Sequence, residues 1–254
     1  MLNIIKPDWP APPSIIALTT TRQGGVSEGN YESLNLGHHV GDNLAHVNEN
    51  RQRLRTFSKL TQEPIWLNQT HSNTIISFDD LDFTESKTNP PSADGSYTTQ
   101  PQLACAVLTA DCLPVLLCNK AGTEIAAVHV GWRGCLAGIL SEAIKKFQSN
   151  PSEIMAWFGP AIGPEAFEVG PEVFEAFTTD QPKNIPAFIP QTNGKYLANL
   201  YYLATIALNL AGVTAVYGGD YCTFTDHNLF FSYRKSGGNT GRMASLIVIA
   251  ENQP

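Results

Sequence analysis

The sequence has little of what marks nucleic-acid-binding, membrane-spanning or secreted proteins. Its 254 residues include 16 Lys and Arg against 23 Asp and Glu, for a net charge of −7. Binding to a phosphate backbone needs clustered basic residues, and the chain shows no basic stripe, so we expect no nucleic-acid partner. No apolar run approaches the roughly 18 residues that cross a bilayer, and residues 1–10 lack a long apolar signal segment. We therefore expect a cytoplasmic protein that does not bind membranes.

Cysteines are also few, and their number is odd. A disulfide framework uses paired cysteines in an oxidising compartment, so this composition favours reduced thiols. Most of the five lie in or near segments that are predicted to be buried strands or a helix. They are Cys105, Cys112, Cys118, Cys135 and Cys222.

The sequence shows no internal repeat, low-complexity tract or Gly/Ser linker, so we expect one domain over residues 1–254. Apolar strand-like segments interleave with amphipathic ones, which predicts a mixed α/β fold with a partly antiparallel sheet flanked by helices. The acidic, proline-rich run 79–92 is expected to be a surface loop. The expected strands are 15–21, 65–67, 74–78, 103–108, 114–118, 125–130, 154–158, 213–217 and 243–250, and the expected helices are 43–60, 134–149, 171–177 and 200–211.

Two of these strands are predicted to form a hairpin that brings a thiol close to an imidazole. Residues 114–118 and 125–130 are apolar, and the polar run 119–124 between them is typical of a hairpin loop. If residue 118 faces 125, then 114 faces 129, and Cys112 shares a strand face with position 114. Cys112 and His129 would then be diagonal neighbours, about 7–8 Å apart at Cα, close enough to share a small ion. A register slip of one residue would separate them.

A second histidine, His71, lies in a polar loop and is a candidate third member of this group. Two imidazoles and one thiolate leave a fourth position open, which is the arrangement of a catalytic zinc. Such a zinc lowers the pKa of a bound water to about 7. The same residues also fit a metal-free Cys–His nucleophilic pair or a copper site. Cys105 and Cys118, in contrast, are expected to be ordinary core thiols.

Arginines near two turns are candidate anion ligands. Gly131-Trp132-Arg133-Gly134 lies between a strand and a predicted helix, where backbone N–H groups favour anions and Arg133 adds a bidentate donor. An ordinary turn with a surface arginine explains the same pattern. Thr240-Gly241-Arg242 follows a glycine-rich loop and offers a second arginine. Glu165 and Glu168, in the loop 159–170, are expected to belong to a structural turn.

At these residues the chain resembles the YfiH/laccase-domain family. The family is described as multicopper polyphenol oxidase-like, as purine nucleoside phosphorylases, or as peptidoglycan-editing factors. The combination of Thr-Ala-Asp-Cys with His-x-Gly-Trp-Arg is highly specific for it. The motifs that carry the resemblance are Thr19 to Gly25, Ser33 to Leu36, Gln69 to His71, Ala93 to Gly95, Thr109 to Cys112, His129 to Arg133, Gly159 to Gly163 with Glu168 to Gly170, and Thr240 to Arg242.

The resemblance implies a metal site at His71, Cys112 and His129, usually assigned to zinc, in a mixed α/β fold shared with a toxin deamidase domain. It also implies phosphorolysis of adenosine, inosine and methylthioadenosine, and hydrolytic deamination of adenosine. In that case a purine nucleoside and phosphate are the partners, with Arg133 holding the phosphate and Arg242 assisting. Ala161 and Glu165 stand where relatives often carry other small residues or cysteine, which bears on substrate preference.

Three other functions fit the same residues. Bacterial relatives imply an amidase that removes wrongly incorporated serine from a muramyl peptide precursor. The laccase label implies a copper-dependent phenol oxidase, but the six histidines of the chain are too few and too scattered for several coppers. The third function is a zinc-stabilised partner-binding module, which the open fourth ligand position disfavours.

Overall fold

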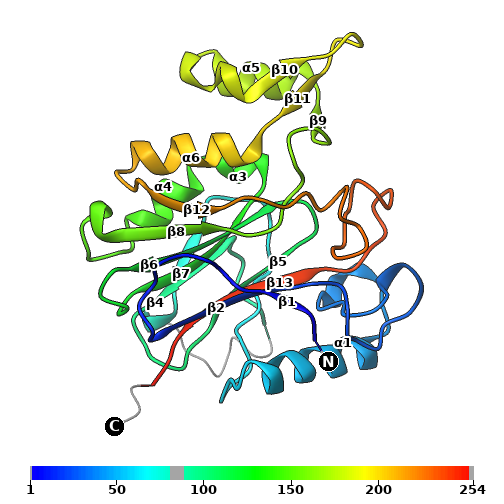
Figure 1. Ribbon diagram of the computed structural model, residues 1–254, viewed down its shortest axis with the longest axis vertical. Coiled ribbons are helices and arrows are strands. Elements are labelled where there is room, and N and C mark those ends of the chain that lie inside the picture. The colour runs from blue at the N-terminus through cyan, green and yellow to red at the C-terminus, as the bar shows by residue number, and fades with distance from the viewer. Residues whose placement is uncertain (1, 81–88, 252–254) are drawn as a thin grey trace.

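The computed structural model describes residues 2–80 and 89–251. Two β-sheets pack face to face, and helices cover the outer face of each sheet (Figure 1). Helix α1 (Leu44–Phe57) covers one side, and α3 (Trp132–Leu136), α4 (Ile139–Ile144) and α6 (Leu200–Leu210) cover the other. The mixed α/β fold with partly antiparallel sheets is therefore confirmed.

The smaller of these two sheets is antiparallel throughout and has four strands in the order β1-β2-β13-β5. Leu54 of α1 packs on its outer face together with Leu18 and Leu246. The side chain of Asn43 caps α1 by accepting a 2.9 Å hydrogen bond from the Ala45 N–H, a contact worth about 1 kcal/mol in such helices. The strands are β1 (Ile4–Ile5), β2 (Ile15–Thr20), β5 (Cys105–Thr109) and β13 (Met243–Ile249).

The larger sheet has six strands in the order β12-β8-β6-β7-β4-β3, and it contains the predicted hairpin. Pro114 pairs with His129 and Cys118 with Ile125, so the predicted register of β6 and β7 is confirmed. Two edge pairs, β12–β8 and β3–β4, are parallel. The strands are β3 (Ile75–Ser77), β4 (Gly95–Thr98), β6 (Leu113–Asn119), β7 (Ile125–Val130), β8 (Ile154–Phe158) and β12 (Ala215–Gly218).

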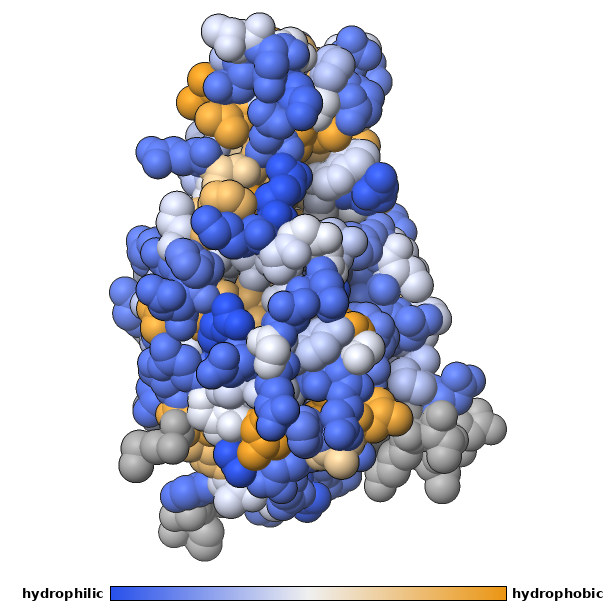
Figure 2. All heavy atoms as spheres, turned by 90° about the vertical axis from the view of Figure 1, so that its right-hand side faces the viewer, coloured by the Kyte–Doolittle hydropathy of each residue, from blue (hydrophilic) through white to orange (hydrophobic). Residues whose placement is uncertain are grey.

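A small lobe projects from the helical side of the larger sheet (Figure 1). It consists of α5 (Pro171–Thr178) and a three-stranded antiparallel sheet of β9 (Glu168–Val169), β10 (Phe188–Pro190) and β11 (Tyr196–Ala198). Stacked and edge-on aromatic rings fill its interior, including Phe174 against Tyr196 at 4.2 Å between centroids. Figure 2 shows a mostly hydrophilic face of the molecule, with apolar side chains exposed among the hydrophilic ones on this lobe.

Short 3-10 turns join several of these elements, and the described residues contain no helix long and apolar enough to cross a membrane. One of the turns carries His38 and His39, and His39 lines the cavity beside the candidate metal ligands. The turns are Gly29–Tyr31, His38–Val40, Phe78–Asp80, Pro151–Glu153 and Pro182–Ala187.

Two sequence-based predictions of secondary structure are wrong, and a third is only partly testable. Among the described residues, 65–67 pair with no strand, and Asn68 next to them forms an isolated bridge with Ser92. The helix expected over 134–149 begins earlier, at Trp132, and is broken at Gly138, whose φ of +82° is a left-handed conformation that ends α3. Of the loop predicted at 79–92, residues 81–88 lie outside the described part of the chain.

Candidate metal centre

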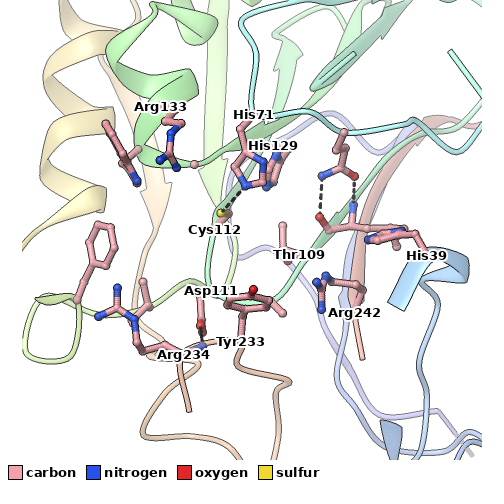
Figure 3. Close-up of a pocket in the computed structure, with 17 residues that line it drawn as sticks. His39, His71, Thr109, Asp111, Cys112, His129, Arg133, Tyr233, Arg234 and Arg242 are labelled. Atoms are coloured by element: carbon pink, nitrogen blue, oxygen red, sulfur yellow. Dashed lines mark hydrogen bonds between the residues drawn. The ribbon is translucent and has the colours of Figure 1, made fainter. Parts of the chain in front are cut away.

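Three side chains from separate segments meet at one end of the six-stranded sheet. Cys112 stands just before β6, His129 lies near the end of β7, and His71 lies in the loop before β3. Their ligand atoms all lie within 4.8 Å of one another, and Cys112 Sγ is 3.8 Å from His71 Nε2 (Figure 3). The two imidazole rings meet edge to face with centroids 4.8 Å apart. The structure thus brings together the three residues that the sequence predicts as metal ligands.

A buried carboxylate, Asp94, holds both histidines in place. Its Oδ1 accepts hydrogen bonds from His129 Nδ1 at 2.8 Å and from the His71 N–H at 2.9 Å. Its Oδ2 accepts from the backbone N–H groups of Ser72 at 2.6 Å and Thr70 at 3.1 Å. Because Nδ1 of His129 is bonded to the carboxylate, Nε2 is the ring atom left to act as a ligand. A carboxylate behind a ligating histidine is the usual outer partner of a metal site.

The charges of the cluster reinforce one another. Burial raises the pKa of the Cys112 thiol, but the adjacent His129 and His71 outweigh burial and lower that pKa to about 6. Burial likewise opposes the charged form of His129, but the Cys112 thiolate and Asp94 raise its pKa to about 9. Burial also opposes the ionised form of Asp94, but hydrogen bonds from His129 and Ser72 hold its pKa well below the ordinary value. Cys112 is therefore held as a thiolate at neutral pH, the form that ligates metals.

Glycine is required where β7 ends beside the cluster. A Cβ at Gly131 would lie 2.8 Å from His71 Cδ2 and 3.2 Å from Cys112 Sγ. His71 itself has a φ of +61°, held by the bond from its N–H to Asp94. The adjacent Gln69 fastens the same loop to β5, because its side-chain amide donates to and accepts from the Leu108 backbone at 2.8 Å each. Loop and strand together fix the position of the His71 imidazole.

The cluster opens into a cavity of about 450 Å³ with arginines around its walls (Figure 3). Arg133 is exposed, and its guanidinium lies 4.3 Å from the centroid of the Trp132 ring. Arg242 is half-buried and donates to the carbonyls of Thr240 at 2.9 Å and Gly241 at 3.0 Å. Both arginines that the sequence singles out therefore line the same cavity as the candidate ligands.

Several residues of this cavity are absent from the sequence-based candidates. Asp94 appears there only as part of a family motif, and its one local signal is a lone acid between Ala93 and Gly95. Tyr233 and Arg234 stand in a glycine-rich segment that has no periodic pattern, yet both line the cavity. Glu168, expected to be structural, forms a 2.6 Å ion pair with Lys195. Glu165 does not line the cavity.

The donor set fits a metal ion. Zinc bonds of about 2.0–2.3 Å place the ligand atoms of one tetrahedral zinc about 3.3–3.8 Å apart. The 3.8 Å between Cys112 Sγ and His71 Nε2 lies at the upper end of this range, and the limit of 4.8 Å for the whole group lies beyond it, so the side chains would draw together around a bound ion. Within residues 2–80 and 89–251, this is the single group of three or more His, Cys, Asp or Glu side chains that could hold an ion. Two imidazoles and a thiolate suit zinc and also copper.

Comparison with known proteins relates the whole chain to one family. Residues 16–250 match the family model described as multi-copper polyphenol oxidoreductase laccase. Purine nucleoside phosphorylase YfiH of Escherichia coli is 50% identical over 247 residues, which cover 97% of this chain and 99% of that protein. A purine nucleoside phosphorylase of Pseudomonas aeruginosa is 46% identical over 244 residues, with 96% of this chain and 97% of that protein covered.

Solved structures agree with the sequence matches. The crystal structure of a Neisseria meningitidis protein is 48% identical and superposes with a TM-score of 0.91, covering 98% of this chain and 100% of that one. YlmD from Geobacillus stearothermophilus is 30% identical with a TM-score of 0.86, covering 94% and 93%. The chain belongs to the YfiH family, whose members share this fold and whose family model carries the laccase description.

Proposed function

We propose that this protein is a zinc-dependent purine nucleoside phosphorylase in which His71, Cys112 and His129 hold the metal. The observation that carries the proposal is the juxtaposition of an open three-ligand group with an arginine-lined cavity. Relatives that are 46–50% identical carry the name purine nucleoside phosphorylase. A cavity of about 450 Å³ also lies within the range of small-molecule sites, about 300–1,000 Å³.

The walls of the cavity supply groups for both substrates. Tyr233 exposes 53% of its surface, and together with Trp132 and Phe167 it offers aromatic surface to a purine. Arg133 has its guanidinium at the cavity wall and is suited to bind phosphate in bidentate fashion. Arg242 lies across the cavity from Arg133 and adds positive charge (Figure 3). These charges would attract an anionic co-substrate into the site of an otherwise acidic protein.

In the proposed reaction, an oxygen of hydrogen phosphate attacks C1′ of the ribose. The N9–C1′ bond breaks, its electron pair leaves with the purine, and the proton of hydrogen phosphate ends on the purine. Arg133 holds the attacking phosphate, and the aromatic wall orients the base. A divalent metal held by the three ligands would supply a Lewis acid that stabilises developing negative charge. The products are the free base and ribose 1-phosphate.

Deamination of adenosine is a second candidate activity, because three ligands leave one coordination position of the metal for water. In this reaction water adds to the purine carbon that bears the amine, and ammonia leaves. The positions of His71, Cys112 and His129 serve this chemistry as well as phosphorolysis. The two activities differ in one requirement that is simple to measure, since only phosphorolysis consumes phosphate.

The test incubates zinc-loaded protein with adenosine or inosine, with and without phosphate, and separates the products by chromatography. Phosphate-dependent release of adenine or hypoxanthine with ribose 1-phosphate supports the phosphorylase, and phosphate-independent formation of inosine from adenosine supports the deaminase. Parallel loading with copper or zinc identifies the active metal. A protein that leaves nucleosides untouched but cleaves a serine-containing muramyl peptide, or oxidises phenols with copper, overturns the proposal.

A further inference from the structure

Asp111 has a conformation and a set of contacts that the proposed reaction does not account for. It lies between β5 and β6, immediately before the candidate ligand Cys112, and it exposes only 8% of its surface. Its φ is +93°, outside the conformations that side chains other than glycine readily adopt. Asp and Asn tolerate the left-handed region better than most residues, but the conformation still costs free energy. The surrounding contacts must therefore hold it.

The carboxylate and carbonyl of Asp111 join three segments that are far apart in the sequence. Oδ1 accepts a 2.6 Å hydrogen bond from the buried hydroxyl of Thr223, and Oδ2 accepts a 2.7 Å bond from the backbone N–H of Arg234. The carbonyl oxygen accepts from the N–H of Ile162 at 2.9 Å. Within residues 2–80 and 89–251, no basic side chain forms an ion pair with this carboxylate. Both carboxylate oxygens are thus bonded to uncharged donors on other loops.

The segment that Asp111 holds is the cavity wall opposite the metal ligands (Figure 3). Arg234 is fixed at its other end as well, because its guanidinium donates to the Glu168 carbonyl at 2.8 Å and lies 5.8 Å from the Phe167 ring centroid. The Tyr233 ring, one residue earlier, faces the Arg242 guanidinium at 5.6 Å. The residue that anchors this opposite wall, Asp111, is therefore the direct sequence neighbour of the candidate metal ligand Cys112.

We propose that Asp111 is a positioning residue that sets the gap between the metal ligands and the Tyr233–Arg234 wall and so determines how tightly the nucleoside binds. This inference rests on the proposed function, since it takes a purine nucleoside as the molecule that spans the gap. Asp111 acts through the wall and the Cys112 backbone, with no part in bond making. Loss of the anchor should loosen the wall and weaken substrate binding while the ligands still hold the metal.

Two substitutions of Asp111 distinguish the effect of its hydrogen bonds to the wall from the effect of its negative charge. Asp111→Gly removes the carboxylate without adding strain, because glycine adopts positive φ freely. Asp111→Asn removes the charge but keeps both links, because the amide oxygen can accept from the Arg234 N–H and the amide NH₂ can donate to the Thr223 hydroxyl. Loss of the two hydrogen bonds that hold the wall weakens the contacts of the wall with substrate, and a loss of this size corresponds to about 10-fold in binding. We expect Asp111→Gly to raise KM for inosine about 10-fold or more with kcat changed much less, and Asp111→Asn to stay within about threefold of wild type.

Metal content and thermal unfolding accompany the kinetics, because a purely structural role would lower the midpoint of unfolding without moving KM in the folded protein. An unchanged KM in Asp111→Gly overturns the inference. Equal defects in Asp111→Asn and Asp111→Gly also overturn it, since charge would then matter more than the links. Loss of zinc from Asp111→Gly overturns it too, because the residue would then belong to the ligand shell.

Tryptic cleavage measures how firmly Asp111 holds the wall, and it does not depend on enzymatic activity. The held segment contains Arg234 and Lys235, which are both exposed. Mass spectrometry should show faster cleavage after these two residues in Asp111→Gly than in wild type or Asp111→Asn. Equal cleavage rates overturn the inference whatever the activity. If wild-type protein converts no nucleoside, the proposed function fails, and the cleavage rates still decide whether Asp111 holds the wall.

Discussion

Two buried carboxylates stand at opposite ends of the ladder between β4 and β7. Asp94 immediately precedes β4 and bonds to His129, and Glu124 immediately precedes β7 and bonds to the Tyr97 hydroxyl at 2.8 Å. Asp94 is fully buried and Glu124 exposes only 5% of its surface. Hydrogen bonds outweigh burial for both and lower the pKa of each carboxyl group. Measured by burial and pKa alone, the two carboxylates look alike.

Their hydrogen-bond donors separate them. Glu124 accepts from Asn119 Nδ2 at 3.0 Å and from the backbone of Gln148 at 2.6 Å and Ser149 at 3.1 Å. These contacts fix a hairpin turn and the segment after α4, and none of them faces the cavity. Asp94 instead bonds to an imidazole whose other nitrogen faces a thiolate. A lowered carboxyl pKa therefore does not by itself mark a functional site. The donor that the carboxylate binds, an imidazole of the candidate metal centre or a structural backbone group, distinguishes the two cases.

The largest effect is expected from removing the Cys112 thiolate, which lies at the Asp94 end of the β4–β7 ladder. Cys112→Ala takes away one of three candidate ligands. Loss of an outer partner of a metal ligand already costs about 10–100-fold in metal affinity or activity, so loss of a ligand should cost more than about 100-fold. Metal analysis and phosphorolysis rates measure the effect. Cys222→Ala removes another half-buried free thiol and should retain metal and activity. Full activity in Cys112→Ala would contradict the proposed site.

A subtler change tests the carboxylate itself. Asp94→Asn keeps one accepting oxygen, replaces the other by an NH₂ group, and loses the charge that holds His129 and the His71 loop. We expect metal affinity to fall about 10–100-fold, measured by competition with a chelator. Glu124→Gln makes the same chemical change at the other end of the ladder and should leave metal affinity at the wild-type value. Equal losses in both variants would mean that general stability, and not the histidine contact, carries the effect.

The proposed phosphate contact gives a smaller effect. A charge-assisted hydrogen bond contributes about 1.5–3 kcal/mol, which corresponds to about 10–100-fold in binding. Arg133 is exposed, so water can replace part of its contact with phosphate. Arg133→Gln should therefore raise KM for phosphate by about 10-fold, the lower end of this range. The KM for the nucleoside should change less. Arg53→Gln, which breaks an exposed pair with Glu49 at 2.8 Å, is the matched control and should change neither constant.

The difference between the two carboxylates also shows what the sequence could predict. The register of β6 and β7 follows from two apolar runs and the polar turn between them, so the sequence alone places Cys112 and His129 together. Asp94 could not be placed in this way, because β4 (Gly95–Thr98) is short and polar and gives no strand signal. Without β4, nothing in the pattern connects Asp94 with His129.

Other features depended on contacts that no local pattern records. The break at Gly138 lies within an apolar 3.6-residue period that continues beyond it, so the period alone predicted one long helix. The partners of Asp111 lie 112 and 123 residues away, at Thr223 and Arg234, in segments without regular structure. Periodicity predicts the elements that carry the site, and long-range polar contacts then determine its geometry.

Glu124 offers the smallest expected effect on activity, and its effect on stability has a predictable pH dependence. The Gln148 N–H bonds to Oε1 and the Ser149 N–H to Oε2, so Glu124→Gln leaves one of these two donors facing an amide NH₂. An unsatisfied buried donor costs about 1–3 kcal/mol in the free energy of unfolding. The folded-state pKa of Glu124 is lower than its ordinary value of 4.5. The carboxylate therefore stabilises the fold above the pKa of the unfolded chain, and this stability is lost as the pH falls through the folded-state pKa.

Urea denaturation at neutral pH should accordingly show Glu124→Gln to be less stable than wild type, with phosphorolysis unchanged in the folded protein. The gap between the two proteins should narrow as the pH falls below 4.5, because only wild type loses a charged group at position 124. A gap that is constant with pH would mean that the cost comes from packing and not from ionised acceptors. Loss of metal from Glu124→Gln would contradict the contrast between Asp94 and Glu124, because both carboxylates would then support metal binding.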